Sequence, residues 1–218
     1  MMVNKKIKTV AEWWKQFLQA CPFLISDWVK RETYWLKNNV KKNSAVLDIG
    51  CGWGDDLKTI AKIIKSSIGI DNDLKVLKEA KNNLSRFKNI KLFLKDAKKL
   101  DFKDNTFDYV ICLGNTFGNL GRDKYKALKE MKRVVKNKGK IVISVYSEKA
   151  LPARIEGYKK MIWPIKRITK EGTVYVKGGI ISEQFSRKKI KKIFNLAKLK
   201  VNIQELNPIS YICIATKR

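Results

Sequence analysis

The strongest constraint on the fold is the segment VLDIGCGWGDD, residues 46–56, together with the alternation that follows it. An apolar run contains one aspartate, three glycines alternate with other residues, and two acids come next. Short β-branched runs then alternate with segments of helical period as far as residue 146. Such alternation is typical of a parallel sheet with helices on both faces. Glycines directly after a strand indicate that a ligand approaches the backbone closely.

The hydrophobic periodicity predicts the individual elements. Helices are expected at residues 10–18, 26–39, 55–64, 74–87, 123–135 and 186–197, with Asn137-Lys-Gly139 ending the fifth helix and Ser186 capping the sixth. Strands are expected at residues 46–49, 67–70, 90–94, 107–113, 140–146, 201–206 and 211–216, the last two as antiparallel neighbours. Residues 173–176 and 180–183 are expected to form a hairpin. Residues 148–168 show a mixed pattern with two prolines.

The length and composition indicate an ordinary globular protein. A chain of 218 residues suits one α/β domain with an appendage. No apolar run reaches the length of a membrane span, and the basic N-terminus lacks the apolar core of a signal peptide. A cytoplasmic protein is therefore expected, and its oligomeric state is left open.

The cysteines and histidines bear on metal binding. None of the four cysteines belongs to a CxxC pair, and the chain has no histidine. The usual zinc patterns are absent, so no metal site is expected. Cys112 and Cys213 lie in apolar strand-like runs, which favours buried free thiols.

The net charge of +28 raises nucleic acid or an anionic membrane as a partner. However, 40 of the 48 basic residues are lysine, and they are scattered over nearly every expected helix. Arginine is the preferred fork for phosphate and base edges. A lysine-rich composition without a specific role therefore explains the charge about as well as nucleic-acid binding does.

The spacing of the glycines limits the classes of ligand that the loop can bind. A dinucleotide fingerprint reads G-x-G-x-x-G, whereas Gly50, Gly52 and Gly54 place the third glycine one position early. Asp55 and Asp56 occupy the first turn of the helix that follows. Each carboxylate would repel a phosphate by about 4 kcal/mol at ~4 Å and an effective dielectric near 20. A ligand with positive charge and no phosphate fits this loop better.

Two further strand ends carry acids. Asp71 follows the second strand, where a carboxylate can accept both hydroxyls of a ribose. Asp96 and Ala97 follow the third strand, where an acid and a free N–H can bind the edge of an adenine. Ribose, adenine and a cationic tail together describe S-adenosylmethionine.

With these residues in view, the chain resembles the class I S-adenosylmethionine-dependent methyltransferases. The similarity covers residues 42–146 through VLDIGCGWGDDL, IGIDND, LFLKDAKKLDF, FDYVICLGNTFGNL and LKEMKRVVKNKGKIVIS. The resemblance implies a Rossmann-like, doubly wound α/β fold with seven strands in the order 3-2-1-4-5-7-6, strand 7 being antiparallel. It also implies a cofactor site made of Asp48, Gly50, Cys51, Gly52, Gly54, Asp71, Asn72, Asp96, Ala97, Leu113 and Gly114.

The same resemblance suggests a division of one methyltransferase domain into four parts. Residues 1–41 would form an N-terminal helical cap and residues 42–146 the cofactor-binding core. Residues 147–185 would be an insert covering the acceptor site, and residues 186–218 the last helix and the terminal hairpin. Trp13 and Trp14, in the cap, would pack on the domain or serve as a lid, while Trp53 would pack or wall the cofactor.

The methyl acceptor is less constrained. Methyl transfer from a sulfonium requires in-line positioning, and a general base is optional. The loop after Gly114 lacks the N/D-P-P-Y/F signature of base and glutamine methylation, and no Pro-Cys marks a cytosine C5 enzyme. We expect transfer to a nitrogen or oxygen of a small molecule; the alternative is an RNA (tRNA or rRNA) or protein substrate docked on the lysine-rich residues 122–140 and 187–192. The acceptor-site candidates are Asn115, Thr116, Tyr146, Glu148, Arg154 and Tyr158.

Overall fold

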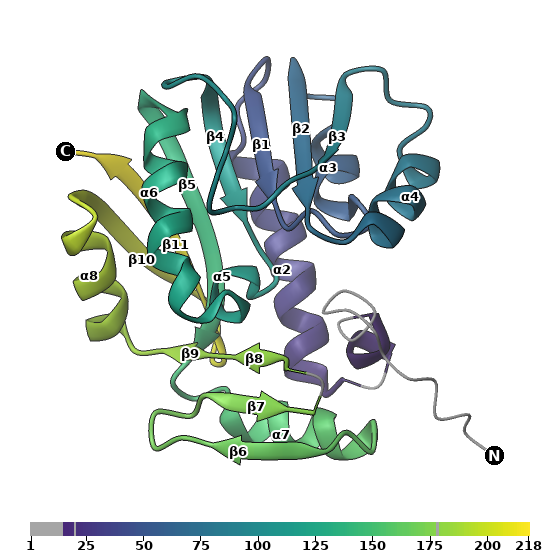
Figure 1. The fold of residues 1–218 in the computed structure, drawn as a ribbon, viewed down its shortest axis with the longest axis vertical. Coiled ribbons are helices and arrows are strands. Elements are labelled where there is room, and N and C mark those ends of the chain that lie inside the picture. The colour runs from purple at the N-terminus through teal and green to yellow at the C-terminus, as the bar shows by residue number, and fades with distance from the viewer. Residues whose placement is uncertain (1–14, 20, 178) are drawn as a thin grey trace.

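The computed structural model describes residues 15–19, 21–177 and 179–218. The expectations for Trp13, Trp14 and the start of the first helix lie outside these residues. Residues 15–19 are helical, in agreement with the end of that helix. Figure 1 shows the arrangement of the elements described below.

The main sheet has the strand order β10-β11-β5-β4-β1-β2-β3, and a short strand β9 pairs with β5 (Figure 1). With β10 and β11 as the sixth and seventh strands, this confirms the predicted order 3-2-1-4-5-7-6. β11 runs antiparallel to both β5 and β10, as expected. The two-residue β9 is an addition that the sequence did not indicate. The strands span β1 (Ala45–Ile49), β2 (Ser66–Asp71), β3 (Ile90–Leu94), β4 (Phe107–Cys112), β5 (Val135–Ser147), β9 (Gln184–Phe185), β10 (Leu199–Asn207) and β11 (Ser210–Lys217).

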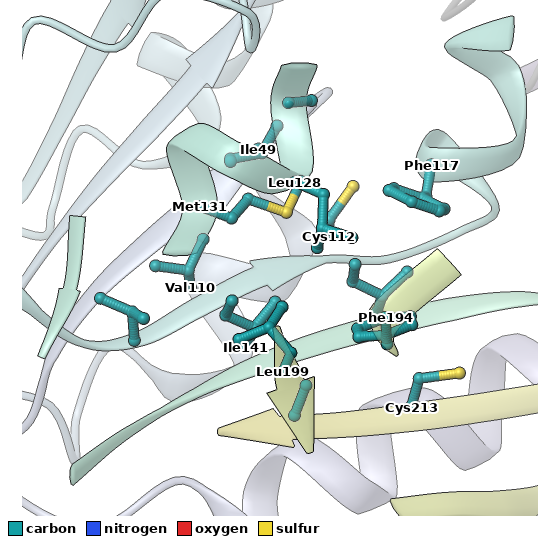
Figure 2. Packing of buried hydrophobic residues seen from close by; sticks show 14 of the residues in the cluster. Ile49, Val110, Cys112, Phe117, Leu128, Met131, Ile141, Phe194, Leu199 and Cys213 are labelled. Atoms are coloured by element: carbon teal, nitrogen blue, oxygen red, sulfur yellow. The ribbon is translucent and has the colours of Figure 1, made fainter. Parts of the chain in front are cut away.

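Helices cover both faces of this sheet, and the side-chain alternation of β4 shows how. Val110 and Cys112 point into the larger hydrophobic cluster, which contains residues of α5, α6 and α8 (Figure 2). Tyr109 and Ile111 point to the other face, where α2 and α3 pack. Both faces are therefore buried, as a parallel sheet requires. The helices span α2 (Phe23–Asn39), α3 (Asp55–Ile60), α4 (Leu74–Asn83), α5 (Thr116–Asn119), η1 (Gly121–Asp123), α6 (Lys124–Val134) and α8 (Arg187–Leu196).

The segment between β5 and α8 forms a small subassembly below the main sheet (Figure 1). It consists of α7 (Leu151–Lys160) and an antiparallel sheet of β6 (Ile165–Ile168), β7 (Val174–Val176) and β8 (Ile181–Ser182). The predicted hairpin is confirmed as the β7–β8 pair. The helix α7 and the strand β6 were not predicted. Phe17 and Trp28 share a hydrophobic cluster with Tyr158 of α7, so the N-terminal helices and this segment have a common core.

The fifth helix ends within one residue of its predicted end, but the predicted role of Asn137-Lys-Gly139 as its stop and the predicted start of the next strand at residue 140 are wrong. Helix α6 ends at Val134, and the chain is extended from Val135 onward, so Asn137-Lys-Gly139 lies within β5. Val135 pairs with Phe107 of β4, and its side chain is fully buried. Val135 is β-branched, which favours a strand, and its burial against β4 stabilises the early start of β5.

Helix α3 also ends earlier than predicted. It stops at Ile60, and the side chain of Asn89 donates hydrogen bonds to the carbonyls of Ala61 (2.9 Å) and Ile64 (3.2 Å). These contacts satisfy carbonyl groups that a helix end leaves free. Because Asn89 is 25 or more residues distant in sequence, no local pattern indicated this end.

The cysteines are free, as predicted for Cys112 and Cys213, which are both buried. Burial raises the pKa of each thiol. Within the part of the chain that the structure describes, no helix is both long enough and apolar enough to cross a bilayer.

Candidate functional site

A cavity of about 270 Å³ opens at the carboxyl ends of β1, β2 and β4. Parallel strands of an open α/β sheet place their ligand sites at this edge. Leu18 and two residues of α2, Val29 and Glu32, also line the cavity. The lining residues are Leu18, Val29, Glu32, Gly50, Cys51, Gly52, Trp53, Asp55, Asp56, Asp71, Asn72, Asp73, Leu113, Gly114, Thr116, Asn119 and Leu120.

The glycine loop has the backbone conformation that only glycine adopts readily. Gly50, Gly52 and Gly54 have φ values of 71°, 52° and 82°. A side chain at Gly50 would collide with Thr116, whereas no atom lies within 4 Å of the position that a Cβ on Gly52 would take. Gly52 lines the cavity, so its bare backbone leaves room for a ligand at that point.

Asp71 connects the end of β2 to the glycine loop. One carboxylate oxygen accepts a hydrogen bond from the N–H of Gly52 (3.0 Å), and the other accepts from the N–H of Asp73 (3.0 Å). Burial raises the pKa of Asp71, and these N–H contacts oppose the rise. The carboxylate is therefore held at the cavity wall in a fixed orientation, next to Asn72.

The cavity wall is acidic although the chain is strongly basic. Glu32, Asp55, Asp56, Asp71 and Asp73 line it, and the described residues place no lysine or arginine there. Burial, followed by the nearby charge of Asp56, raises the pKa of Glu32 to about 8. Burial, followed by the charge of Asp55, raises the pKa of Asp56 to about 7. Carboxyl groups crowded in this way favour a positively charged ligand and disfavour a phosphate.

Four of the predicted cofactor residues do not line the cavity. Asp48 is 1% exposed, its Oδ2 has no hydrogen-bond partner among the residues described, and burial raises its pKa well above the usual range. Gly54 precedes α3 and donates its N–H to the Cys51 carbonyl (2.8 Å). Asp96 is exposed and pairs with Lys98 at 3.3 Å, while Ala97 packs against the larger cluster. Their cofactor roles stay predictions.

Seven of the predicted cofactor residues line the cavity: Gly50, Cys51, Gly52, Asp71, Asn72, Leu113 and Gly114. They come from three strand ends that are distant in sequence, and the sheet order brings them together. Burial raises the pKa of the Cys51 thiol, which therefore stays protonated.

Among the acceptor-site candidates, Thr116 lines the cavity. Asn115, the adjacent residue, is 1% exposed and instead links three elements. Its Oδ1 accepts from the N–H of Tyr146 (3.2 Å), and its Nδ2 donates to Ser182 Oγ (3.5 Å) in β8. Tyr146 is fully buried, with its ring centroid 4.7 Å from that of Trp28.

The remaining candidates lie in the segment after β5, none of whose described residues lines the cavity. Arg154 is fully buried and donates to the carbonyls of Gly172 (2.9 Å) and Ser182. Tyr158 is fully buried against Phe17, and Glu148 is exposed. These contacts hold the segment together.

Sequence reasoning missed Glu32. It lies on the buried face of α2 with Ile25, Trp28 and Leu36, and it is 4% exposed. Its Oε1 accepts a hydrogen bond from the N–H of Gly114 at 3.3 Å. An acidic residue within an apolar helical stripe was the signal that could have found it, since such residues are rarely buried without a partner.

Trp53 forms part of the cavity wall. Its Nε1 donates to Glu79 Oε2 (2.9 Å), and the Lys15 ammonium lies 5.3 Å from the ring centroid. Lys15 also pairs with Glu79 at 3.3 Å. Trp53 thus connects the glycine loop to α4 and to the N-terminal helix.

Comparisons with known proteins agree with this geometry. A family model described as a methyltransferase domain matches residues 40–198. The demethylmenaquinone methyltransferase of Staphylococcus aureus strain MRSA252 is 36% identical over 132 residues, which are 58% of this chain and 54% of that protein. The chain thus spans about half the length of the curated relatives it matches.

Solved structures share the fold across nearly the whole chain. The PH0226 protein of Pyrococcus horikoshii has a TM-score of 0.75 at 20% identity, covering 95% of this chain and 99% of that one. The 1,6-didemethyltoxoflavin-N1-methyltransferase of Burkholderia thailandensis, solved with its substrate and S-adenosylhomocysteine, has a TM-score of 0.69 at 14% identity, covering 88% of this chain and 78% of that one. The family match, the strand order and the glycine loop agree, and the chain belongs to the methyltransferase-domain family of class I S-adenosylmethionine-dependent methyltransferases.

Proposed function

We propose that this protein transfers a methyl group from S-adenosylmethionine to a nitrogen or oxygen of a small molecule. The observation that carries the proposal is the carboxylate-lined cavity at the glycine loop. When bound, S-adenosylmethionine supplies a methyl group already activated by a sulfonium. Its sulfonium and ammonium charges match the acidic wall, whereas a pyrophosphate would be repelled by it.

The residues at the cavity divide into three roles. The bare backbone at Gly52 would accommodate the methionine end, and the fixed carboxylate of Asp71 would accept the ribose hydroxyls. Leu18 and Val29 cover the cavity and would exclude water. Because the methyl is already activated, holding the acceptor in line supplies much of the rate.

Two observations support a small acceptor. Leu18, together with Val29 and Glu32 of α2, lines one side of the cavity, whose volume of about 270 Å³ suits a small molecule. The relatives named above, a demethylmenaquinone methyltransferase and a toxoflavin N-methyltransferase, are named for small molecules.

Titration calorimetry with S-adenosylhomocysteine tests the donor site. The Asp71→Ala variant should lose measurable binding, because the ribose would lose its acceptor and the Gly52 N–H would lose its partner. The Asp101→Ala variant is a matched control, since that exposed carboxylate pairs with Lys95 on the surface. Unchanged affinity in Asp71→Ala would refute the ribose assignment.

An RNA or protein substrate is the second candidate, and one observation favours it. Helices α6 and α8 pack on the same face of the sheet (Figure 1), which would allow an extended substrate to contact the basic residues of both. The exposed basic residues on and beside these helices include Arg122, Lys126, Lys129, Lys188, Lys191 and Lys192. RNA binding that is tight at moderate salt and falls steeply as salt rises would support this candidate. Weak binding at moderate salt would leave the small-molecule proposal standing.

A further inference from the structure

Glu32 differs in origin from the other acids of the cavity. Asp55 and Asp56 belong to the helix after the glycine loop, and Asp71 and Asp73 belong to the end of β2. Glu32 comes from α2, which precedes the segment matched by the family model. Its carboxylate therefore enters the cavity from a different part of the chain than the other four acids do.

Six of the lining residues do not come from the strand ends, from the glycine loop or from the helix that follows this loop, and we call these six residues the distal wall. It combines three apolar side chains with three polar ones, and Thr116 lies directly against Gly50 of the glycine loop. These residues come from the N-terminal helices and from the segment between β4 and α6. The distal wall consists of Leu18, Val29, Glu32, Thr116, Asn119 and Leu120.

The carboxylate of Glu32 is held firmly at this wall. It is 4% exposed, and the N–H of Gly114 fixes one oxygen at 3.3 Å. Among the described residues of the distal wall, Glu32 is the only one with an ionisable side chain. Contacts with Ser144, Gly114 and Trp28 lower the pKa of Glu32, but burial outweighs them, so a cationic ligand in the cavity would stabilise the charged carboxylate.

We propose that Glu32 selects a basic amine as the methyl acceptor, its carboxylate binding the amino group at the distal wall. The inference rests on the proposed function and names the chemical class of its acceptor. An alcohol could donate one hydrogen bond to the same carboxylate, but it would bring no charge. A carboxylic acid would bring a like charge into a cavity that already has five carboxyl groups.

The surroundings of Glu32 also suit proton transfer from an ammonium. Asp56 of α3 faces it with negative charge, while Cys112 and Tyr146, on β4 and β5, are nearby groups that stay neutral because burial raises the pKa of each. This setting makes Glu32 a stronger base than an exposed glutamate. A proton that moves from an ammonium nitrogen to the Glu32 carboxylate leaves a neutral amine with a free lone pair and a neutral carboxylic acid.

A matched series of ligands tests the proposal on protein saturated with S-adenosylhomocysteine. The series is cyclohexylmethylamine, cyclohexylmethanol and cyclohexanecarboxylate, which share one carbon skeleton. Binding is measured by calorimetry or ligand-observed NMR at pH 8. The wild type should bind the amine at least about 10-fold more tightly than the alcohol, and the carboxylate least, as expected for a charge-assisted hydrogen bond.

Variants show whether Glu32 causes the preference. Glu32→Gln should weaken amine binding about 10- to 100-fold while S-adenosylhomocysteine affinity changes less than about threefold. Glu32→Asp retains the charge and should recover part of the preference. Glu156→Gln, an exposed residue paired with Lys160, removes the same charge elsewhere and should bind like the wild type.

Three results would overturn the inference: no preference for the amine, an amine preference that survives in Glu32→Gln, or equal losses of amine and S-adenosylhomocysteine in that variant. The last would place Glu32 at the donor. Failure of the proposed function is distinguishable, because the wild type would then not bind S-adenosylhomocysteine at all.

Discussion

Replacing Glu32 by glutamine should stabilise the protein, although it removes a residue that we assign to acceptor binding. Glu32 is 4% exposed, and burial is the main cause that raises its pKa from 4.5 to about 8. A glutamine has nearly the same shape, and its amide oxygen can still accept the hydrogen bond from the N–H of Gly114. It cannot ionise, so the cost of a buried charge disappears.

The magnitude follows from the two pKa values and depends on pH. The unfolded carboxyl ionises near 4.5 and the folded one near 8. Below pH 4.5, Glu32 therefore does not lower the free energy of unfolding of the wild type. Between pH 4.5 and pH 8 this free energy falls progressively because the buried carboxyl resists ionisation, and above pH 8 the penalty is constant. At ~1.4 kcal/mol per pKa unit, the penalty is roughly 3 kcal/mol at pH 7 and roughly 5 kcal/mol above pH 8.

Urea unfolding followed by circular dichroism, at pH 4, 7 and 9, measures this difference. Glu32→Gln and the wild type should be equally stable at pH 4, and the variant should gain at pH 7 and again at pH 9. Glu156→Gln is the control, because its exposed ion pair contributes little at any pH. A variant that is no more stable than the wild type at pH 7, or whose advantage does not grow with pH, would refute the reasoning.

Other contacts lead to three further predictions. Gly52→Val should fold with a loss of about 1–2 kcal/mol, because a β-branched residue is strained at φ 52°, and calorimetry should show that its side chain blocks S-adenosylhomocysteine binding. Arg154→Met should lower the free energy of unfolding by about 3 kcal/mol, since the carbonyls of Gly172 and Ser182 lose their donor. The folded variant should keep its affinity for S-adenosylhomocysteine, and a loss of affinity would contradict a purely structural role. Lys124→Met should cost about 3 kcal/mol in chemical denaturation because it leaves the buried Glu183 with Lys189 alone, and a neutral effect would show that the pair is dispensable.

Most of the residues predicted for the cofactor site line the cavity, because the features that point to them are local in the sequence. The early third glycine and the adjacent Asp55 and Asp56 disfavoured a phosphate, and the structure has an acidic cavity at that loop. Asp71 was predicted from its place after a strand, and it lies at the cavity wall with both oxygens hydrogen-bonded. Residues next to strand ends are predictable in this way because parallel strands bring their carboxyl ends to one edge.

The side of the cavity that we propose for the acceptor could not be predicted in the same way, since segments distant in sequence form it. Asn115, Tyr146 and Arg154 are polar or aromatic residues near the expected site, yet their side chains form hydrogen bonds and ring contacts within the interior. Glu32 lies 82 residues before Gly114 and was assigned to no site. The sequence pattern shows that one face of α2 is buried, but it does not show which part of that face lines the cavity.

The sequence by itself determined the strand–helix alternation, the glycine conformation of the loop and the preference for a cationic ligand, because each depends on neighbouring residues. The tertiary structure alone decided that α2 places Glu32 in the cavity, that the segment after β5 shares a core with the N-terminal helices, and that β5 begins at Val135. These outcomes depend on which buried surfaces meet. Burial also sets the charge state of Glu32, and with it the kind of acceptor that we propose.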